Sequence, residues 1–283
     1  MNDLPDIVTL AIPGFILLML IEIAVLKWRG SDGYETADTA TSLLLGLGST
    51  IAGALSAGLF YAMAAAVQSF GGESLGLPQL GFAWWVWPLC FLLDDLAYYV
   101  FHRSAHRVRW FWAGHVVHHS SQHYNLSTAL RQTWTGFFAL SFIFRLPLFL
   151  VFPPAMIFFC AGLNLIYQFW IHTEAVGRLP RWFEAVMNTP SHHRVHHGTN
   201  ARYLDRNYAG VFIIWDRLFG TFVEEKDDQP VEYGITRPVY SNSLVVNWCH
   251  EYADMFRAMG QKGPLTQRLK HLWKPPEWER ESN

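Results

Sequence analysis

The chain has 283 residues, of which 51% are hydrophobic and only 16% are charged. An ordinary soluble domain carries roughly 25% charged residues, so this composition favours a membrane protein. The 21 basic and 23 acidic side chains give a net charge of -2, which excludes the broad basic surface that nucleic-acid binding needs. The 3 cysteines are scattered and fit neither a disulfide framework nor a zinc-finger spacing.

Apolar segments follow one another along the first part of the chain. The segment 7–26 is long enough to cross a bilayer, because about 20 apolar residues span the hydrocarbon core. Acidic Asp3 and Asp6 precede it, so we expect a retained span and not a cleaved signal peptide. Two further spans are expected at 40–67 and 82–101, and the segments 134–151 and 153–170 are expected to form a tight hairpin.

Positive charge follows three of these apolar units. Lys27 and Arg29 close the first segment, Arg103, Arg107 and Arg109 follow the third, and Arg178, Arg181 and Arg194 follow the hairpin. Counted in turn, the three basic clusters lie on one side, which the positive-inside rule makes cytoplasmic. The expected fold is an all-α integral membrane protein with four to five transmembrane or re-entrant helices and a cytosolic, histidine-rich helical cap.

The histidines are concentrated in one part of the chain. Of 13 histidines, 11 lie between His102 and His197. His102 and His106 have the spacing of one helix face, and the segments 115–119 and 193–197 each carry the pattern HxxHH. Neighbouring histidines in such a triplet diverge by about 100° around a helix, so one can bind a first metal ion while the next reaches a second.

These patterns supply more ligands than one metal ion can use. Two triplets, the HxxxH pair and His172 after the hairpin make nine imidazoles, which suit two ions. Imidazole accepts Fe, Zn, Cu or Ni, and the lack of nearby thiolates argues against an iron–sulfur cluster. A single HxxxH pair would arise by chance on a surface helix, but three such patterns within a hundred residues would not. The expected ligands are His102, His106, His115, His118, His119, His172, His193, His196 and His197.

Two further residues are candidates for holding these ligands in place. Asp95 lies two helical turns before His102, where a carboxylate could accept the second N–H of a metal-bound imidazole. The alternative for Asp95 is a buried helix-packing role. His192 stands one residue out of register with its triplet and is expected beside the ligands or at the surface, as is His123. The isolated His250 and His271 are expected to be structural.

At these residues the chain resembles the fatty acid hydroxylase and sterol desaturase superfamily, whose pattern is HxxxH, HxxHH, HxxHH. The resemblance is closer to a branch that acts on ether lipids, through the phrases HHSSQHYNLSTALRQ, YQFWIHTE, NTPSHHRVHHG and NYAGVFIIWDRLFGTF between His118 and Phe222. It implies two non-haem irons held by the nine histidines, ether-lipid substrates and a tetrahydrobiopterin reductant. Arg107 and the pair Gln122–His123 replace acidic residues of that pattern, which counts against the pterin but not against the irons.

The resemblance also implies a domain organisation. We expect one membrane oxygenase domain over residues 1–283. Its expected parts are transmembrane spans in 7–101, the first histidine clusters in 102–131, a helical hairpin in 134–171, the third histidine cluster and cap in 172–222, and a cytosolic tail in 223–283.

The expected function is a membrane-bound, di-iron, O₂-dependent lipid monooxygenase that hydroxylates a C–H bond of a lipid chain, with the ether-linked carbon of an alkylglycerol as one such site. Its partners are a bilayer lipid, O₂ and an electron donor, which is a pterin, a ferredoxin or a cytochrome. A fatty acid or sterol hydroxylase or desaturase supplied by a ferredoxin or cytochrome is the alternative. A membrane metal carrier is a more distant one, because a carrier would place ligands along its spans. A bacterial cytoplasmic membrane is expected in preference to the endoplasmic reticulum.

Overall fold

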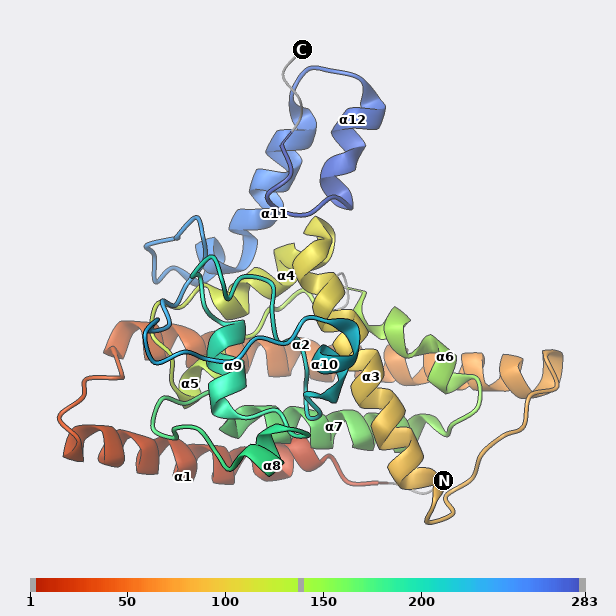
Figure 1. Ribbon diagram of the computed structural model, residues 1–283. Helices are drawn as coiled ribbons and strands as arrows, with labels where there is room; N and C mark the ends of the chain where they lie inside the picture. Colours follow the sequence, from red (N-terminus) through yellow and green to blue (C-terminus); the bar gives the residue numbers. More distant parts are fainter. Residues whose placement is uncertain (1–3, 137–139, 280–283) are drawn as a thin grey trace.

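The computed structural model describes residues 4–136 and 140–279, and within these ranges it is helical and has no β-strand (Figure 1). The long helices are α1 (Ile7–Trp28), α2 (Thr36–Ser69), α3 (Val86–Arg107), α7 (Pro154–Trp170) and α11 (Leu244–Gly260). The shorter α-helices are α4 (Arg109–His119), α5 (Leu126–Ala129), α6 (Leu146–Phe149), α8 (Arg181–Glu184), α9 (Pro190–His196), α10 (Ile214–Phe219) and α12 (Leu265–Leu269). A π-helical turn η1 (Phe70–Ser74) and two 3₁₀ turns, η2 (Ser141–Arg145) and η3 (Lys270–Leu272), complete the described chain. The all-α prediction is confirmed.

Two helices are long and apolar enough to cross a membrane. One is α1, with 22 residues, and the other is α2 continued by η1, which runs from Thr36 to Ser74 over 39 residues. They run in opposite directions and are joined at the left of the view (Figure 1). Large apolar side chains such as Leu55, which is 84% exposed, lie on their outer surfaces. Apolar surface of this extent is typical of a helix that faces lipid.

Helix α3 lies where a third span was expected, but it differs from α1 and α2. It is not among the helices apolar enough to cross a membrane, and its carboxylates Asp94 and Asp95 are both fully buried. Arg145 from η2 pairs with Asp94, with Nε 2.6 Å from Oδ1. The helix also continues past the expected end through His102 and His106 to Arg107. It therefore carries the first histidine pair on a rigid element.

The expected hairpin has one long arm and one short, broken arm. Helix α7 forms the second arm as predicted, but the described part of the first arm contains only the short turns η2 and α6. Leu140 has a left-handed φ of 54°, and Pro147 lacks the N–H that a continuous helix would need. Residues 137–139, which belong to this arm, lie outside the described residues. Between α3, α6 and α7, side chains including Cys90, Phe149, Met156 and Ile157 form the main apolar core.

The segment 223–283 was expected as a tail, and its described part, residues 223–279, folds back onto the helix bundle. Helices α11 and α12 project to the top of the view, and α11 lies against α4 (Figure 1). Arg109 at the start of α4 pairs with Glu251 of α11, with Nε 2.6 Å from Oε1. The main-chain N–H of Arg109 also donates to the carbonyl of Lys274. The last part of the described chain therefore supports the helix that carries three of the expected ligands.

A buried carboxylate joins the first helix to the histidine region. Glu22 of α1 is only 3% exposed. It accepts hydrogen bonds from the Tyr34 hydroxyl, the Thr173 hydroxyl and the Leu126 main-chain N–H, the last at 2.8 Å. Thr173 directly follows His172, and Leu126 begins α5, so this one side chain aligns α1 with two segments of the site.

We expect Glu22→Leu to destabilise the protein more than Glu22→Gln does. The leucine leaves three buried donors without an acceptor, at a cost of about 1–3 kcal/mol for each, whereas the glutamine keeps one accepting oxygen. Thermal unfolding of the detergent-solubilised protein measures the difference. Glu73→Leu, the same replacement at an exposed position, is the control, and equal melting temperatures for all three variants would contradict this role of Glu22.

Candidate metal centre

The nine expected ligands come from four separate parts of the fold. The C-terminal half of α3 carries His102 and His106, α4 carries the first triplet, α9 and the residue after it carry the second, and His172 follows α7. Eight of the nine are buried, with at most 7% of each side chain exposed, and His115 is half-buried. Histidines that are far apart in sequence therefore meet in the interior.

The nine side chains form two groups, each with its ligand atoms within 4.8 Å of one another. The five-histidine group contains His102, His106, His115, His119 and His196. The four-histidine group contains His118, His172, His193 and His197. Every histidine predicted as a ligand belongs to one of these groups.

Neighbouring histidines in each triplet serve different groups. His118 and His119 lie in different groups, with ring planes 88° apart, and so do His196 and His197, also 88° apart. The two groups are adjacent, because the stacked rings of His119 and His197 have centroids 4.3 Å apart. This is the division that the helical spacing of HxxHH predicts.

In the four-histidine group, two nitrogen acceptors face each other. His118 Nδ1 lies 3.3 Å from the Arg131 carbonyl oxygen, and His172 Nδ1 lies 2.7 Å from that of Gln168. A carbonyl oxygen can only accept, so each Nδ1 carries the proton and each Nε2 has a free lone pair. These two Nε2 atoms are nevertheless 3.1 Å apart. Such a contact is repulsive unless a cation lies beside both nitrogens.

The five-histidine group also contains close ring nitrogens and buried nitrogens without partners. His102 Nδ1 donates to the Tyr208 carbonyl at 2.8 Å, and the Nε2 of His102 lies 2.9 Å from the Nε2 of His115. The Nε2 atoms of His106 and His196 are buried and have no hydrogen-bond partner among the described residues. Buried polar atoms without partners are rare and point to a bound group.

A proton cannot supply the missing cation at neutral pH. Burial lowers the pKa of His118 to about 4. Burial likewise holds the pKa values of His102 and His172 well below the ordinary histidine value. The imidazoles are therefore neutral, which is the form that binds metal. Metal–nitrogen bonds of about 2.0–2.1 Å place ligands at right angles about 3 Å apart, close to the observed Nε2 separations. The residues present fit transition-metal ions.

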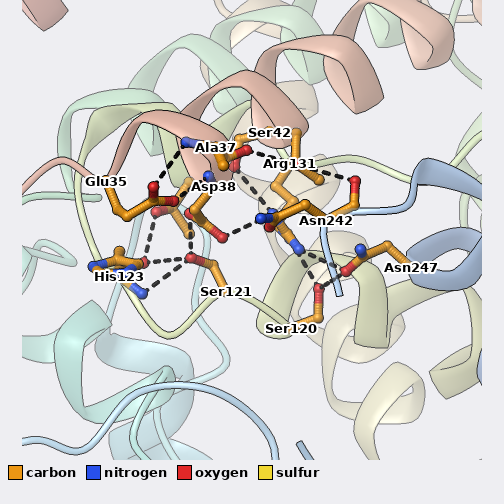
Figure 2. A network of polar contacts seen from close by, with 12 residues as sticks. Glu35, Ala37, Asp38, Ser42, Ser120, Ser121, His123, Arg131, Asn242 and Asn247 are labelled. Atoms are coloured by element: carbon orange, nitrogen blue, oxygen red, sulfur yellow. Dashed lines mark hydrogen bonds and ion pairs between the residues drawn. The ribbon is translucent and has the colours of Figure 1, made fainter. Parts of the chain in front are cut away.

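A fully buried arginine holds the carbonyl that orients His118. Arg131 is 2% exposed, and its guanidinium donates to Ser120 of the first histidine segment, to Asp38 of α2 and to Asn247 of α11 (Figure 2). The distance from Arg131 Nη2 to Asn247 Oδ1 is 2.6 Å. The orientation of one ligand of the four-histidine group thus depends on contacts from α2 and α11.

Asp95 and His192 occupy positions other than those expected beside the ligands. The Asp95 carboxylate accepts from the main-chain N–H groups of Val211 and Phe212 and from the side chains of Trp215 and Asn164. It therefore fixes the segment that follows Tyr208, and none of these bonds goes to a histidine. His192 lies outside both groups, with its ring edge against Phe222.

The residues that do contact ligand Nδ1 atoms were missed by sequence reasoning. Most contribute main-chain carbonyls, as Arg131, Gln168, Arg206 and Tyr208 do, and a carbonyl has no signature in a sequence. The exception is Asp205, whose carboxylate lies 3.4 Å from His106 Nδ1. Asp205 lies in a different segment from His106, so the spacing of the HxxxH pattern does not point to it.

The fatty acid hydroxylase family model matches residues 87–221, a stretch that contains all nine histidines. Over these residues the chain is similar to the fatty acid hydroxylase family. The resemblance inferred from the histidine patterns is confirmed. Helices α3 to α10 of this stretch supply both histidine groups.

Longer relatives share almost the whole of this chain. It is 42% identical to the alkylglycerol monooxygenase of Danio rerio and 39% identical to that of Homo sapiens, in each case over 98% of the chain. The chain spans 61% of the length of each of these two proteins. It is also 25% identical to an ornithine lipid hydroxylase of Rhizobium tropici, over 87% of the chain and 73% of that protein. No solved structure matches the chain significantly.

The metal-free protein should lose stability in mild acid. Burial holds the pKa of His118 at about 4, against 6.5 for an exposed histidine. The unfolded chain therefore binds protons in this interval that the folded chain does not, so stability falls as the pH falls from about 6.5 toward about 4. Thermal unfolding of metal-free protein from about pH 7 to about pH 5 tests this dependence. His118→Leu should flatten the curve, and a melting temperature that is independent of pH in the wild type would contradict the prediction.

Proposed function

We propose that this protein is a membrane-bound, O₂-dependent lipid monooxygenase whose fatty acid hydroxylase domain holds two iron ions. The observation that carries the proposal is the pair of buried histidine groups, in one of which the unprotonated Nε2 atoms of His118 and His172 face each other at 3.1 Å. The identity of 39–42% to alkylglycerol monooxygenases supports an ether lipid as the substrate. The reacting C–H bond is then on the carbon next to the ether oxygen.

Each histidine group would hold one ion. Bound iron supplies the activation of O₂ that C–H hydroxylation requires. The chain's own residues fix the ligands and exclude water: the carbonyls of Arg131, Gln168 and Tyr208 hold three imidazoles with Nε2 pointing inward. Because eight of the nine ligands are at most 7% exposed, the site is closed to bulk solvent. A carrier would instead need ligands along a path through its spans, and none of the nine lies in α1 or α2.

We place the site at the cytoplasmic face of the membrane. Lys27 and Arg29 stand at the end of α1, and Arg29 donates to the carbonyl of Ala175, shortly after the ligand His172. By the positive-inside rule this end of α1 is cytoplasmic. A cytosolic reductant, whether a pterin, a ferredoxin or a cytochrome, would then reach the domain directly.

A groove beside α2 supports entry of the substrate from the bilayer. It has a volume of about 200 Å³ and is lined by Ala52, Gly53, Ser56, Phe60 and Trp134, together with neighbouring small residues. The groove lies on a helix that is apolar and long enough to span a membrane. Entry there spares a lipid chain the transfer into water, which costs about 0.8 kcal/mol for each CH₂ group.

The function can be tested with purified protein loaded anaerobically with ferrous iron. We expect about two irons per chain and, with O₂ and a tetrahydropterin, conversion of an alkylglycerol. Hydroxylation next to the ether oxygen gives a hemiacetal, which separates into a fatty aldehyde and glycerol. His118→Ala and His197→Ala should remain in the membrane but lose activity, because the apolar helices are unchanged.

Fatty acids, sterols and ornithine lipids, with a ferredoxin or cytochrome as reductant, form the comparison panel. Conversion of one of these lipids alone would move the assignment to that class. Iron-loaded protein that oxidises none of the lipids, or a His118→Ala variant with wild-type turnover and full iron content, would contradict the proposal.

Filling the groove should impair long-chain substrates selectively. Gly53→Phe places a large ring among the groove residues, and Gly58→Phe puts the same ring on an open part of the same helix. We expect Gly53→Phe to lower kcat/KM for a long-chain alkylglycerol by more than for a short, water-soluble analogue. Gly58→Phe should leave both values near those of the wild type. Equal losses for both substrates in Gly53→Phe would argue against this route.

A further inference from the structure

A single short segment orients three of the five ligands in the five-histidine group. We call residues 205–208 the strap. The Tyr208 carbonyl accepts from His102 Nδ1 at 2.8 Å, and the Arg206 carbonyl accepts from His196 Nδ1 at 2.9 Å. The Asp205 carboxylate lies 3.4 Å from His106 Nδ1. Each contact holds the proton on Nδ1 and leaves Nε2 to face the interior of the group.

The strap can present these acceptors because its backbone has an unusual conformation. Asp205 has a φ of 58° and Asn207 a φ of 53°, and both values lie in the left-handed region. Asn and Asp tolerate this region better than other residues with a Cβ, yet it persists only where the surroundings impose it. Asp205 and Asn207 are left-handed and have one residue, Arg206, between them. This backbone bends the chain so that the acceptors at 205, 206 and 208 face the same side.

Two buried side chains hold the strap in this conformation. The Asn207 amide donates to the carbonyls of His192 and Val223 and accepts from the Val223 N–H, at 2.7–3.0 Å. The Asp216 carboxylate accepts from the N–H groups of Tyr208 and Ala209, both at 2.8 Å. Asn207 and Asp216 are fully buried. The strap is therefore clamped on both sides of its left-handed residues.

Asp205 is the member of the strap that acts through a charged side chain. Its second oxygen accepts from Arg107, the residue that follows His106, and Arg107 also lies 3.5 Å from Glu277. The arginine thus holds the carboxylate in place beside the ligand. A carboxylate on the second nitrogen of an imidazole orients the ring and makes the metal-binding nitrogen more basic.

The strap has no such role in the four-histidine group. His118 and His172 donate to the carbonyls of Arg131 and Gln168, which lie in other parts of the fold. Among the described residues, no hydrogen bond from the strap reaches a member of that group. A change in the strap should therefore affect one metal ion and not the other.

We propose that Asp205 is a positioning residue for the five-histidine group, and that the left-handed strap makes the affinity of this group for its metal separately adjustable. This inference rests on the proposed function in one respect, that each histidine group holds an ion. It concerns metal binding alone, so it does not require that the substrate be an ether lipid.

The test compares two replacements that both permit a left-handed backbone. Asp205→Asn removes the charge but keeps an accepting oxygen, and Asp205→Gly removes the acceptor altogether. Ferrous iron binding to the detergent-purified full chain is titrated against a chelator, and Mössbauer spectra follow the two iron environments. We expect one ion to bind about 10–100-fold more weakly in Asp205→Gly, with Asp205→Asn between it and the wild type, while the second ion binds unchanged.

Three further variants make the outcome decisive. Asp227→Asn, an exposed carboxylate paired with Arg178, is the matched control and should bind iron as the wild type does. His172→Ala should remove the ion that the Asp205 variants retain. Asn207→Gly keeps the left-handed backbone but removes the hydrogen bonds of the Asn207 side chain, one of the two clamps, so it should reproduce the selective loss even if Asp205→Gly folds poorly.

The role of the strap would be overturned if Asp205→Gly and Asn207→Gly bound both ions with wild-type affinity, or if both ions were lost in parallel. If the variants show this selective loss but the iron-loaded wild type oxidises no lipid, the proposed function is overturned and the strap inference stands. Wild-type protein that binds no iron would overturn both.

Discussion

The structure depends on bringing unprotonated nitrogen atoms together inside the protein. In both histidine groups, Nδ1 atoms are bound to carbonyl oxygens and leave Nε2 lone pairs facing inward, as in His102, His118 and His172. The Nε2 atoms of His118 and His172 are only 3.1 Å apart. Burial keeps the pKa values of these imidazoles low, so protons do not relieve the repulsion. Positive charge from bound metal ions would do so, and the surrounding fold holds the candidate ligands in place for them.

Holding nine imidazoles in this way requires contacts from most of the chain. Glu22 connects α1 to the segment that carries His172, and Arg131 connects α2 and α11 to the carbonyl that orients His118 (Figure 2). Asp95 and Asp216 anchor the main chain on the far side of the strap. Each of these charged groups is buried and satisfied by several partners, which is the condition under which a buried charge is tolerated. The carboxylates of the helices therefore contribute to the site without binding metal.

The two histidine groups are adjacent, but different acceptors orient their imidazoles. The strap orients three members of the five-histidine group, whereas separate carbonyls orient members of the four-histidine group. The two ions would therefore differ in ligand number and in the groups behind the ligands. Such differences adjust the affinity and the chemistry of a metal more finely than the identity of the first ligands does.

The sequence alone predicted the nine candidate ligands and how they divide into two groups. Helical periodicity assigns His118 and His119 to different directions, and the structure places them in different groups, because that angle is a local property of any α-helix. Composition and length likewise predicted the helices at 7–26 and 40–67. The first arm of the hairpin was wrong in part, since Pro147 and the pairing of Arg145 with Asp94 break a segment that hydropathy reads as continuous.

Only the tertiary structure decided which groups accept hydrogen bonds from the second nitrogen of each candidate ligand. Asp95 was expected beside His102 because two helical turns separate them, but its carboxylate turns toward Val211 and Phe212. Asp205 takes the position beside a ligand, although 98 residues separate its partner Arg107 from it. Patterns in a sequence report neighbours along one helix, whereas the acceptors of imidazole N–H groups are mostly main-chain carbonyls on other segments. Their positions follow from packing and from left-handed residues such as Asn207, which no periodicity reveals.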